Sequence, residues 1–310
     1  MKPRRDASLV NLSEIAEIEL FVLKRMKELT LGDHAGVFKG AGFNFVGLRD
    51  WEPGDRLASI DWAQSSLTNF SPMITREFEQ ASNATIVAVA DGSISTRCGA
   101  NGISIAAAIA RAVAAVGLSA VFCQDMFGLI AFDDGFRQTA AARPRIGKSH
   151  VMHCLDLYQH PPASAHRPPS AAFDVQDDVM PSLDSLRKTS VVPVISDFLF
   201  ADAPRVLARL SRLNAIHDVF LIMVDARFAY QLAPVSAGWI ETIDIETGCT
   251  QLVSRRELGR LTVRVGEWQE HLLALARDLS LDMLRVGLDR WAMETTLVEF
   301  VAERRLRKVS

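Results

Sequence analysis

Apolar residues recur at helical spacing near the start of the chain and form continuous runs after residue 84. Residues 12–30 place Leu, Ile, Phe and Met three or four positions apart, which predicts an amphipathic helix. Residues 36–79 instead combine glycines, aromatic residues and the turn dipeptide Pro53-Gly54 with short β-type runs. The sequence therefore predicts a small N-terminal helix-plus-β module over residues 1–80.

From residue 84 onward, apolar strand-like runs alternate with helical patterns. The predicted strands are residues 85–90, 120–124, 127–132, 190–196, 218–224 and 284–287, with a hairpin at residues 239–245 and 250–253. The predicted helices are residues 102–115, 149–158, 203–215, 265–279 and 291–305. Continuous apolar strands are typical of a parallel sheet covered on both faces. We therefore expect an α/β fold over residues 81–310, with a doubly wound, mostly parallel sheet.

The longest apolar run, Ile103 to Cys123, is long enough to span a bilayer. Arg111 lies at its centre, and a central Arg costs about 2.5–3.5 kcal/mol on membrane-insertion scales. Gly117 divides the run into an Ala-rich helical part and a short β-type part. We therefore predict a buried α/β unit here and no membrane span.

Charge and cysteine usage narrow the class of protein. The formal net charge of −3 argues against a nucleic-acid binder, which normally carries a basic excess. The four cysteines are far apart in the sequence and form no CxxC pair, so they fit free thiols in a reducing compartment. The N-terminus lacks the apolar core of a signal peptide. We expect a cytoplasmic protein that binds no nucleic acid.

Polar side chains follow two of the predicted strands at the edge of the sheet where ligands usually bind. Asp91, Ser93 and Ser95 come directly after the run TIVAVA, and Asp197 follows the strand that ends at Ser196. Hard cations such as Mg²⁺ prefer oxygen ligands, and a site with few charged ligands retains exchangeable positions. These residues are therefore a candidate Mg²⁺ site that accepts an outside ligand. The alternative is that they are ordinary turn and helix-capping residues.

Two motifs carry a family resemblance. The segment DGSIS after TIVAVA resembles the metal-ion-dependent adhesion site of von Willebrand factor A domains. The segment from Gly47 to Ser66 resembles the signature of the family called domain of unknown function 58, DUF58. Its distinctive part is Pro53-Gly54-Asp55 followed by Ile60-Asp61-Trp62, and the later SDF at residues 196–198 also matches.

The resemblance implies a von Willebrand factor A-like, Rossmann-type domain with Mg²⁺, or less often Mn²⁺ or Ca²⁺, as its cofactor. It also implies partners, since members of the family typically accompany MoxR-type AAA+ ATPases and help them act on a client protein. In the N-terminal module, Asp55, Asp61 and Trp62 are the candidate partner-binding residues. The third adhesion-site ligand is usually a Thr on a later loop, for which Thr139 and Ser149 are the nearest candidates by position.

No catalytic motif stands out. Gly147-Lys148-Ser149 lacks the glycine that a phosphate-binding loop requires at position 142, where Ala142 stands, and no GxSxG elbow is present. The expected function is a metal-dependent protein-binding adaptor and not an enzyme. Two alternatives stay open at this point: a metal-dependent phosphohydrolase that uses the same carboxylates, and a degenerate, metal-free binding module.

Overall fold

The computed structural model describes residues 9–31, 44–52, 60–79, 84–100, 103–161, 178–186, 189–230, 238–243, 250–287 and 290–309. The chain divides into two compact units. The larger contains residues 1–27 and 84–310, and the smaller contains residues 28–83. This division differs from the predicted boundary at residue 80, because most of the first helix belongs to the larger unit.

That first helix, α1 (Leu12–Leu31), buries one face. Ile15, Ile18, Val22 and Met26 follow each other at spacings of three or four residues, and all are buried. On the same helix, Glu14 receives a 2.6 Å hydrogen bond from Arg111 in the larger unit. The helical periodicity therefore predicted the apolar face of α1 but not which unit that face packs against.

The larger unit is built on a six-stranded sheet with the order β12-β9-β8-β3-β6-β7. Its strands are β3 (Thr85–Asp91), β6 (Met126–Phe132), β7 (Gln138–Arg145), β8 (Val191–Ser196), β9 (Asp218–Val224) and β12 (Asp282–Val286). All neighbouring strands run parallel except β7, which pairs antiparallel with β6 at one edge. The prediction of a mostly parallel α/β sheet is confirmed.

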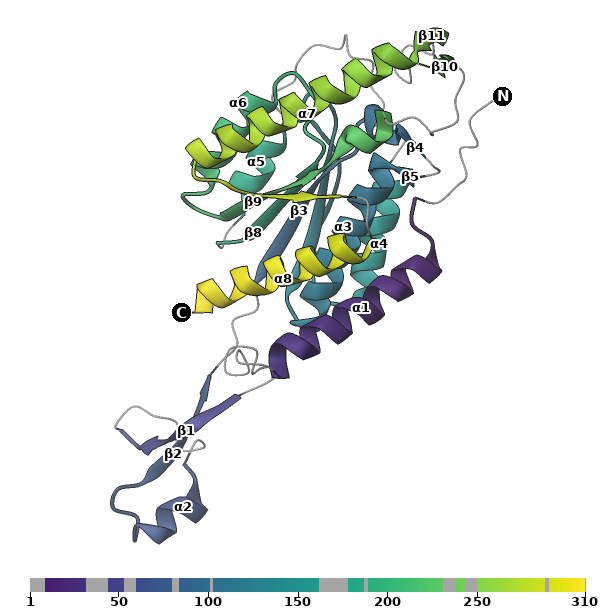
Figure 1. Ribbon diagram of the computed structural model, residues 1–310. Coiled ribbons are helices and arrows are strands. Elements are labelled where there is room, and N and C mark those ends of the chain that lie inside the picture. Colours follow the sequence, from purple (N-terminus) through teal and green to yellow (C-terminus); the bar gives the residue numbers. More distant parts are fainter. Residues whose placement is uncertain are drawn as a thin grey trace. The chain divides into compact units, whose positions relative to one another are not determined.

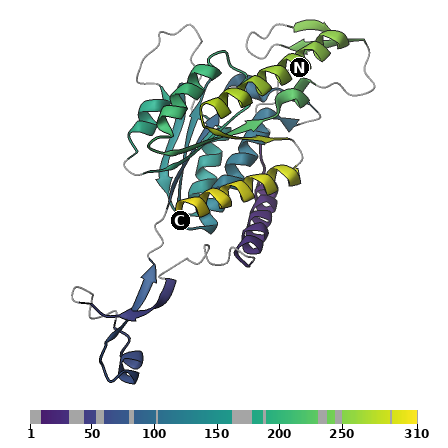
Figure 2. The ribbon, with the colours of Figure 1, turned by 60° about the vertical axis from the view of Figure 1, so that its left-hand side comes forward.

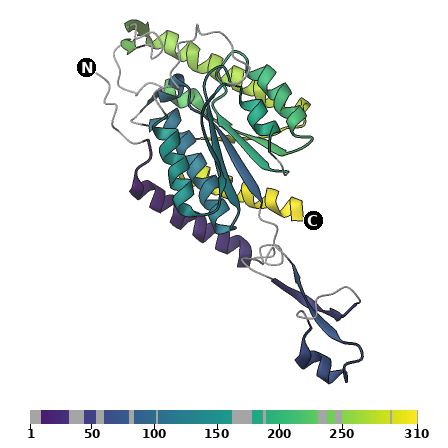
Figure 3. The same ribbon diagram turned by 180° about the vertical axis from the view of Figure 1, so that it is seen from behind.

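Helices cover both faces of this sheet (Figures 1 and 3). One layer contains α3 (Ile105–Phe122), α4 (Lys148–Gln159) and α8 (Arg290–Val309), with α1 on its outer side. The other contains α5 (Val179–Asp184), α6 (Ala203–Leu213) and α7 (Arg255–Asp278). Apolar side chains from β3, β6, β8 and β9 pack with those of α5, α6 and α7 in one continuous core. The strands are apolar on both faces because each face meets a helical layer.

Helix α3 corrects one element of the sequence prediction. Residues 120–124 were expected to form a strand, but the helix continues to Phe122. Gly117 does not end it: a Cβ at this position would lie 2.7 Å from Cγ1 of Val151 and 3.2 Å from Cε1 of Phe127. The glycine is therefore needed for close packing against α4 and β6, and helix continuation prevails over its low helix propensity.

The same helix has the length and a mean hydropathy, 2.0, that would suit a membrane span, and 89% of it is buried inside the protein. Arg111 is itself buried at 7% exposure and is paired with Glu14. An apolar helix with a paired cation is consistent with the central helix of a packed α/β domain, since neighbouring elements surround it on all sides.

The remaining elements of the larger unit are short. They are η2 (Ile94–Arg97), β4 (Gly99–Ala100), β5 (Ile103–Ser104), η5 (Ala226–Tyr230), β10 (Trp239–Ile243) and β11 (Thr250–Ser254). Strands β10 and β11 pair antiparallel, as the predicted hairpin requires. Strand β7 was not expected, because its sequence QTAAARPR has no run of large apolar residues and contains Pro144, which only an edge strand tolerates. Residues 162–177, which follow α4, lie outside the described residues.

The smaller unit contains an antiparallel pair, β1 (Asn44–Asp50) and β2 (Ile74–Glu79), with the short helix α2 (Trp62–Leu67) between them in sequence (Figure 2). The side chain of Ser65 ties the helix to the ribbon, because its hydroxyl accepts a hydrogen bond from the backbone N–H of Ile74 at 2.8 Å. Helix α2 was not expected, because the helix predicted for the N-terminal module was residues 12–30.

Candidate metal centre

Asp91 is the last residue of β3 and is held on three sides. Its Oδ2 accepts a 2.5 Å hydrogen bond from the hydroxyl of Ser196, and its Oδ1 accepts one of 2.9 Å from the backbone N–H of Ser93. Its backbone carbonyl accepts a 2.7 Å bond from the hydroxyl of Tyr158 on α4. The carboxylate is thus fixed at the carboxyl edge of the sheet before any ligand arrives.

Ser93 and Ser95 lie in the loop after β3 and bring their hydroxyls together. The two Oγ atoms are 3.2 Å apart. Two adjacent ligands of an octahedral Mg²⁺ at 2.0–2.1 Å would be about 3 Å apart, and slightly farther apart around Ca²⁺. The spacing of the hydroxyls therefore fits two neighbouring positions in the coordination shell of a small divalent cation.

Asp197 directly follows β8, the neighbour of β3. The two strands are parallel, with Ala90 paired to Ile195, so their ends lie side by side. Oδ1 of Asp197 accepts a 3.0 Å bond from the backbone N–H of Leu199. The topology thus brings the second predicted carboxylate to the edge that holds Asp91.

The two carboxyl groups carry unusual pKa values. Burial raises the pKa of Asp91, opposed by its bonds from Ser196 and Ser93. Burial and then the charge of Asp91 raise the pKa of Asp197 to about 7. A nearby positive charge would compensate for the burial of these carboxylates, because it favours their ionised forms and lowers their pKa values. A divalent cation would supply that compensation.

Access to this site is restricted. Asp91, Ser93 and Asp197 are only 1%, 7% and 4% exposed, whereas Ser95 is partly exposed. An outside ligand would therefore have to approach along the side of Ser95. Within the described ranges, no group of three or more His, Cys, Asp or Glu side chains is placed to hold a metal, so any ion here depends on hydroxyl ligands.

The structure separates the two candidates for a third ligand. Thr139 lies beside the loop, because its Oγ1 is 3.9 Å from where a Cβ on Gly92 would stand. Ser149 is near the start of α4, whereas Tyr158, which bonds Asp91, is near its end. Nine helical residues correspond to about 13 Å along the axis. Thr139 is therefore the candidate beside the loop.

The family model described as "Protein of unknown function DUF58" matches residues 47–266, more than half of the chain. The chain belongs to the DUF58 family. No curated protein matches it.

Solved structures similar to this DUF58 protein are distant. The conserved hypothetical protein BatB from Bacteroides thetaiotaomicron is 12% identical with a TM-score of 0.39, covering 72% of this chain and 100% of BatB. An aerotolerance-related membrane protein from Bacteroides fragilis is 12% identical with a TM-score of 0.40, covering 73% and 100%. PilB minor pilin from Streptococcus sanguinis is 9% identical with a TM-score of 0.39, covering 76% and 64%. At these scores the similarity adds no argument about function.

Sequence reasoning missed several residues that shape the site of this DUF58 protein. Ser196 and Tyr158 hold Asp91, and Gln269 on α7 donates from Nε2 to the backbone carbonyls of Asp197 at 3.0 Å and Val224 at 2.9 Å. Only Ser196 could have been suspected from the sequence, because it directly precedes the predicted ligand Asp197. Nothing in the sequence around Tyr158 or Gln269 marks them, because their partners are distant in sequence.

In the smaller unit of the DUF58 protein, the three partner-binding candidates have different settings. Asp55 lies outside the described residues. Asp61 is buried and caps α2, accepting bonds from the backbone N–H groups of Ala63 at 3.1 Å and Gln64 at 3.2 Å. Trp62 is 60% exposed. The Asp61 carboxylate therefore has a structural task, whereas the indole of Trp62 is accessible to a partner.

Proposed function

We propose that this DUF58 protein is a metal-dependent protein-binding adaptor with a von Willebrand factor A-like domain. The proposal rests on two buried carboxylates, Asp91 and Asp197, at the ends of the neighbouring strands β3 and β8, and on two serine hydroxyls 3.2 Å apart in the loop after Asp91. Asp91, Ser93, Ser95 and Asp197 would hold Mg²⁺, with Thr139 beside them. Mn²⁺ and Ca²⁺ are the other hard cations that suit this ligand set.

Charge balance explains why such a site would bind a partner. Two carboxylates neutralise one divalent cation, and the serine ligands add no charge. Mg²⁺ usually keeps several exchangeable waters, which a carboxylate from another protein can replace. Ser95, the partly exposed member of the set, marks the side from which that carboxylate would enter.

The partner proposed for this site follows from the family resemblance. Proteins of this type accompany MoxR-type AAA+ ATPases, so we propose such an ATPase and its client protein as partners. A cytoplasmic location is part of the same proposal, and the free, buried thiol of Cys154 fits a reducing compartment.

Calorimetry with MgCl₂ and pull-downs with the ATPase test the adaptor function. Asp91→Ala and Asp197→Asn should each abolish measurable Mg²⁺ binding and metal-dependent capture of the ATPase. Asp156→Asn is a matched control, because this carboxylate is 73% exposed on α4. If the wild type and Asp91→Ala bind Mg²⁺ and the ATPase equally well, the proposed metal site is wrong.

A second candidate is a metal-free binding module. It is favoured by the internal bonds of Asp91, whose two carboxylate oxygens already accept hydrogen bonds from Ser196 and Ser93. Capture of the ATPase that persists in EDTA, together with its loss in Trp62→Ala, would favour this candidate over the metal-dependent adaptor.

A further inference from the structure

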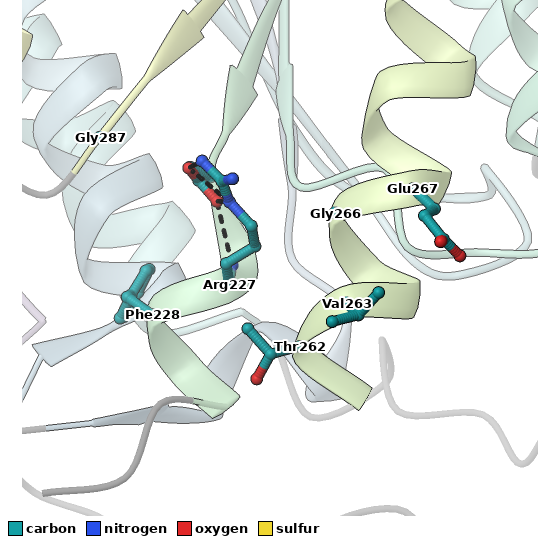
Figure 4. A pocket seen from close by; sticks show the side chains of 8 residues that line it. Arg227, Phe228, Thr262, Val263, Gly266, Glu267 and Gly287 are labelled. Carbon is teal, nitrogen blue, oxygen red and sulfur yellow. Dashed lines mark hydrogen bonds and ion pairs between the residues drawn. The ribbon is translucent and has the colours of Figure 1, made fainter. Parts of the chain in front are cut away.

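A cavity of about 440 Å³ opens near the carboxyl ends of β9 and β12. Its lining residues are Asp225, Arg227, Phe228, Thr262, Val263, Gly266, Glu267 and Gly287 (Figure 4). Asp225 directly follows β9 and Gly287 directly follows β12. The cavity therefore lies at the same edge of the sheet as the candidate metal centre, beyond β8 in the strand order.

The walls of this cavity suit an apolar side chain. Phe228 and Val263 contribute apolar surface, and Val263 is 59% exposed although it is aliphatic. Gly287 adds open space, since a Cβ there would meet nothing within 4 Å. The cavity thus has the size of a small-ligand site and has apolar contact surface.

The charged wall of the cavity is internally neutralised. Nε and Nη2 of Arg227 donate to the carboxylate of Asp225 at distances of 2.6–3.1 Å. Nη2 of Arg285 lies 3.3 Å from the same carboxylate. These charges are paired, and the other charged residue of the lining, Glu267, is exposed to solvent.

Hydrogen bonds connect this cavity to the metal edge. Arg285 donates from Nη2 to Oε1 of Gln269 at 3.4 Å, and Gln269 donates to the backbone carbonyl of Asp197 at 3.0 Å. Gln269 is fully buried, so its amide has no competing water. The hydrogen bonds of Arg285 and Gln269 therefore hold both the loop that carries Asp197 and the wall of the cavity that carries Asp225.

The strand order sets the separation of the two features. The candidate metal centre lies at the ends of β3 and β8, and the cavity lies at the ends of β9 and β12. Two strand spacings separate these pairs, which corresponds to about 10 Å. A peptide in the polyproline II conformation advances about 3.1 Å per residue with three residues per turn. Its residues three positions apart are therefore about 9 Å apart and face the same side, which matches that distance.

We propose that the cavity receives an apolar side chain of the same partner segment whose carboxylate binds at the metal centre. The segment lies across the edge of the sheet in the polyproline II conformation, with its acidic and apolar residues three positions apart and on the same side. This inference rests on the proposed function and specifies the chemistry of the partner.

The probes are Gly/Ser peptides that contain one Glu and one Leu, separated by one to six positions, titrated with excess MgCl₂. Binding should be strongest at a separation of three and should weaken about tenfold or more when Ser replaces Leu, as expected for a lost apolar contact. Val263→Glu, which puts a charge at the rim, and Gly266→Val, which narrows the cavity, should each remove this preference.

Ile216→Glu is the matched control. Ile216 is 63% exposed and lies just before β9, at the opposite edge of the sheet, so the same charge should leave peptide binding unchanged. Unchanged Mg²⁺ affinity in Val263→Glu with loss of the Leu preference supports the inference. Equal binding at all separations, or a preference that survives both cavity variants, overturns it while the metal site stands. Absence of Mg²⁺ binding in the wild type overturns the proposed adaptor and this inference together.

Discussion

The hydroxyl of Ser196 donates a 2.5 Å hydrogen bond to Oδ2 of Asp91, across 105 positions of sequence. Both residues are buried, at 0% and 1% exposure. The bond joins the ends of the adjacent parallel strands β3 and β8. It sets the orientation of a candidate metal ligand and links the two loops that would have to enclose a cation.

Removal of this bond should affect both stability and metal binding. Ser196→Ala leaves a buried carboxylate oxygen without its donor, which costs about 1–3 kcal/mol of unfolding free energy. Mg²⁺ affinity should fall as well, because Asp91 loses its orientation. Urea unfolding and calorimetry measure the two effects. Ser119→Ala is the control: its buried hydroxyl donates to the Ala115 carbonyl within α3, far from any candidate ligand, and should leave Mg²⁺ affinity unchanged.

The pKa of Asp197, about 7, predicts the pH dependence of the metal-free protein. The folded-state pKa lies above 3.8, the ordinary value for an Asp carboxyl, so the folded state binds more protons between these two pH values. The free energy of unfolding should therefore decrease as pH rises from 4 to 7, by at most about 1.4 kcal/mol per pH unit from this group. Denaturation curves across this range in EDTA measure the slope, and Asp197→Asn should reduce it.

Mg²⁺ binding should show the opposite trend. The cation needs the ionised carboxylate, so its affinity should increase with pH up to about 7, by up to about tenfold per unit, because binding displaces a proton. Titrations at several pH values measure this directly. An affinity that is independent of pH between 5.5 and 7.5 would mean that Asp197 is not a ligand.

Gln269 should matter for the site although it is not a candidate ligand. Gln269→Leu removes the amide that donates to the backbone carbonyls of Asp197 and Val224, and the loss should cost roughly 1–3 kcal/mol of stability. Mg²⁺ affinity should decrease because the Asp197 loop loses its anchor. Glu270→Gln on the same helix removes an exposed ion pair with Arg285 and should cost less than about 1 kcal/mol. Equal losses of stability and Mg²⁺ affinity in the two variants would contradict the proposal that Gln269 positions the Asp197 loop.

The ion pair between Glu14 and Arg111 should stabilise the docking of α1. Glu14→Gln keeps an oxygen for the hydrogen bond from the backbone N–H of Asn11 but leaves the buried Arg111 without a negative partner. The expected loss is about 3 kcal/mol, the lower end for a broken buried pair. Glu19→Gln breaks the more exposed pair with Lys148 on the same helix and should cost under about 1 kcal/mol. Thermal unfolding of both variants distinguishes the two pairs.

In the smaller unit, substitution of Asp61 should lower stability, whereas substitution of Trp62 should not. Asp61→Ala removes the N-cap of α2 and should cost about 1 kcal/mol, which Asp61→Ser should restore because serine also caps helices. Trp62→Ala should leave stability nearly unchanged, since the side chain is mostly exposed. Partner capture that is lost in Asp61→Ala and returns in Asp61→Ser would indicate a capping role. Capture that stays lost would indicate direct contact by the carboxylate.

Several features of the fold could be predicted from the sequence because they depend on short-range patterns. The run TIVAVA forms β3 with every residue buried, and the polar residues after it lie at the carboxyl edge. The periodicity of α1 likewise predicted its buried residues. These predictions succeed because burial on both faces of a strand, or on one face of a helix, is encoded in neighbouring residues.

Other features depended on contacts between distant residues. Gly117 lies inside α3, where only a glycine fits beside Val151 and Phe127. The edge strand β7 forms because it pairs with β6.

At the site, DGSIS and Asp197 were identified from the sequence, whereas the partnership of Ser196 with Asp91, the anchor at Gln269 and the choice of Thr139 over Ser149 were not. Local sequence determined which oxygen-bearing side chains follow each strand. Only the tertiary structure decided which of them meet, because strand order and helix packing bring together residues whose separation in sequence gives no sign of their proximity.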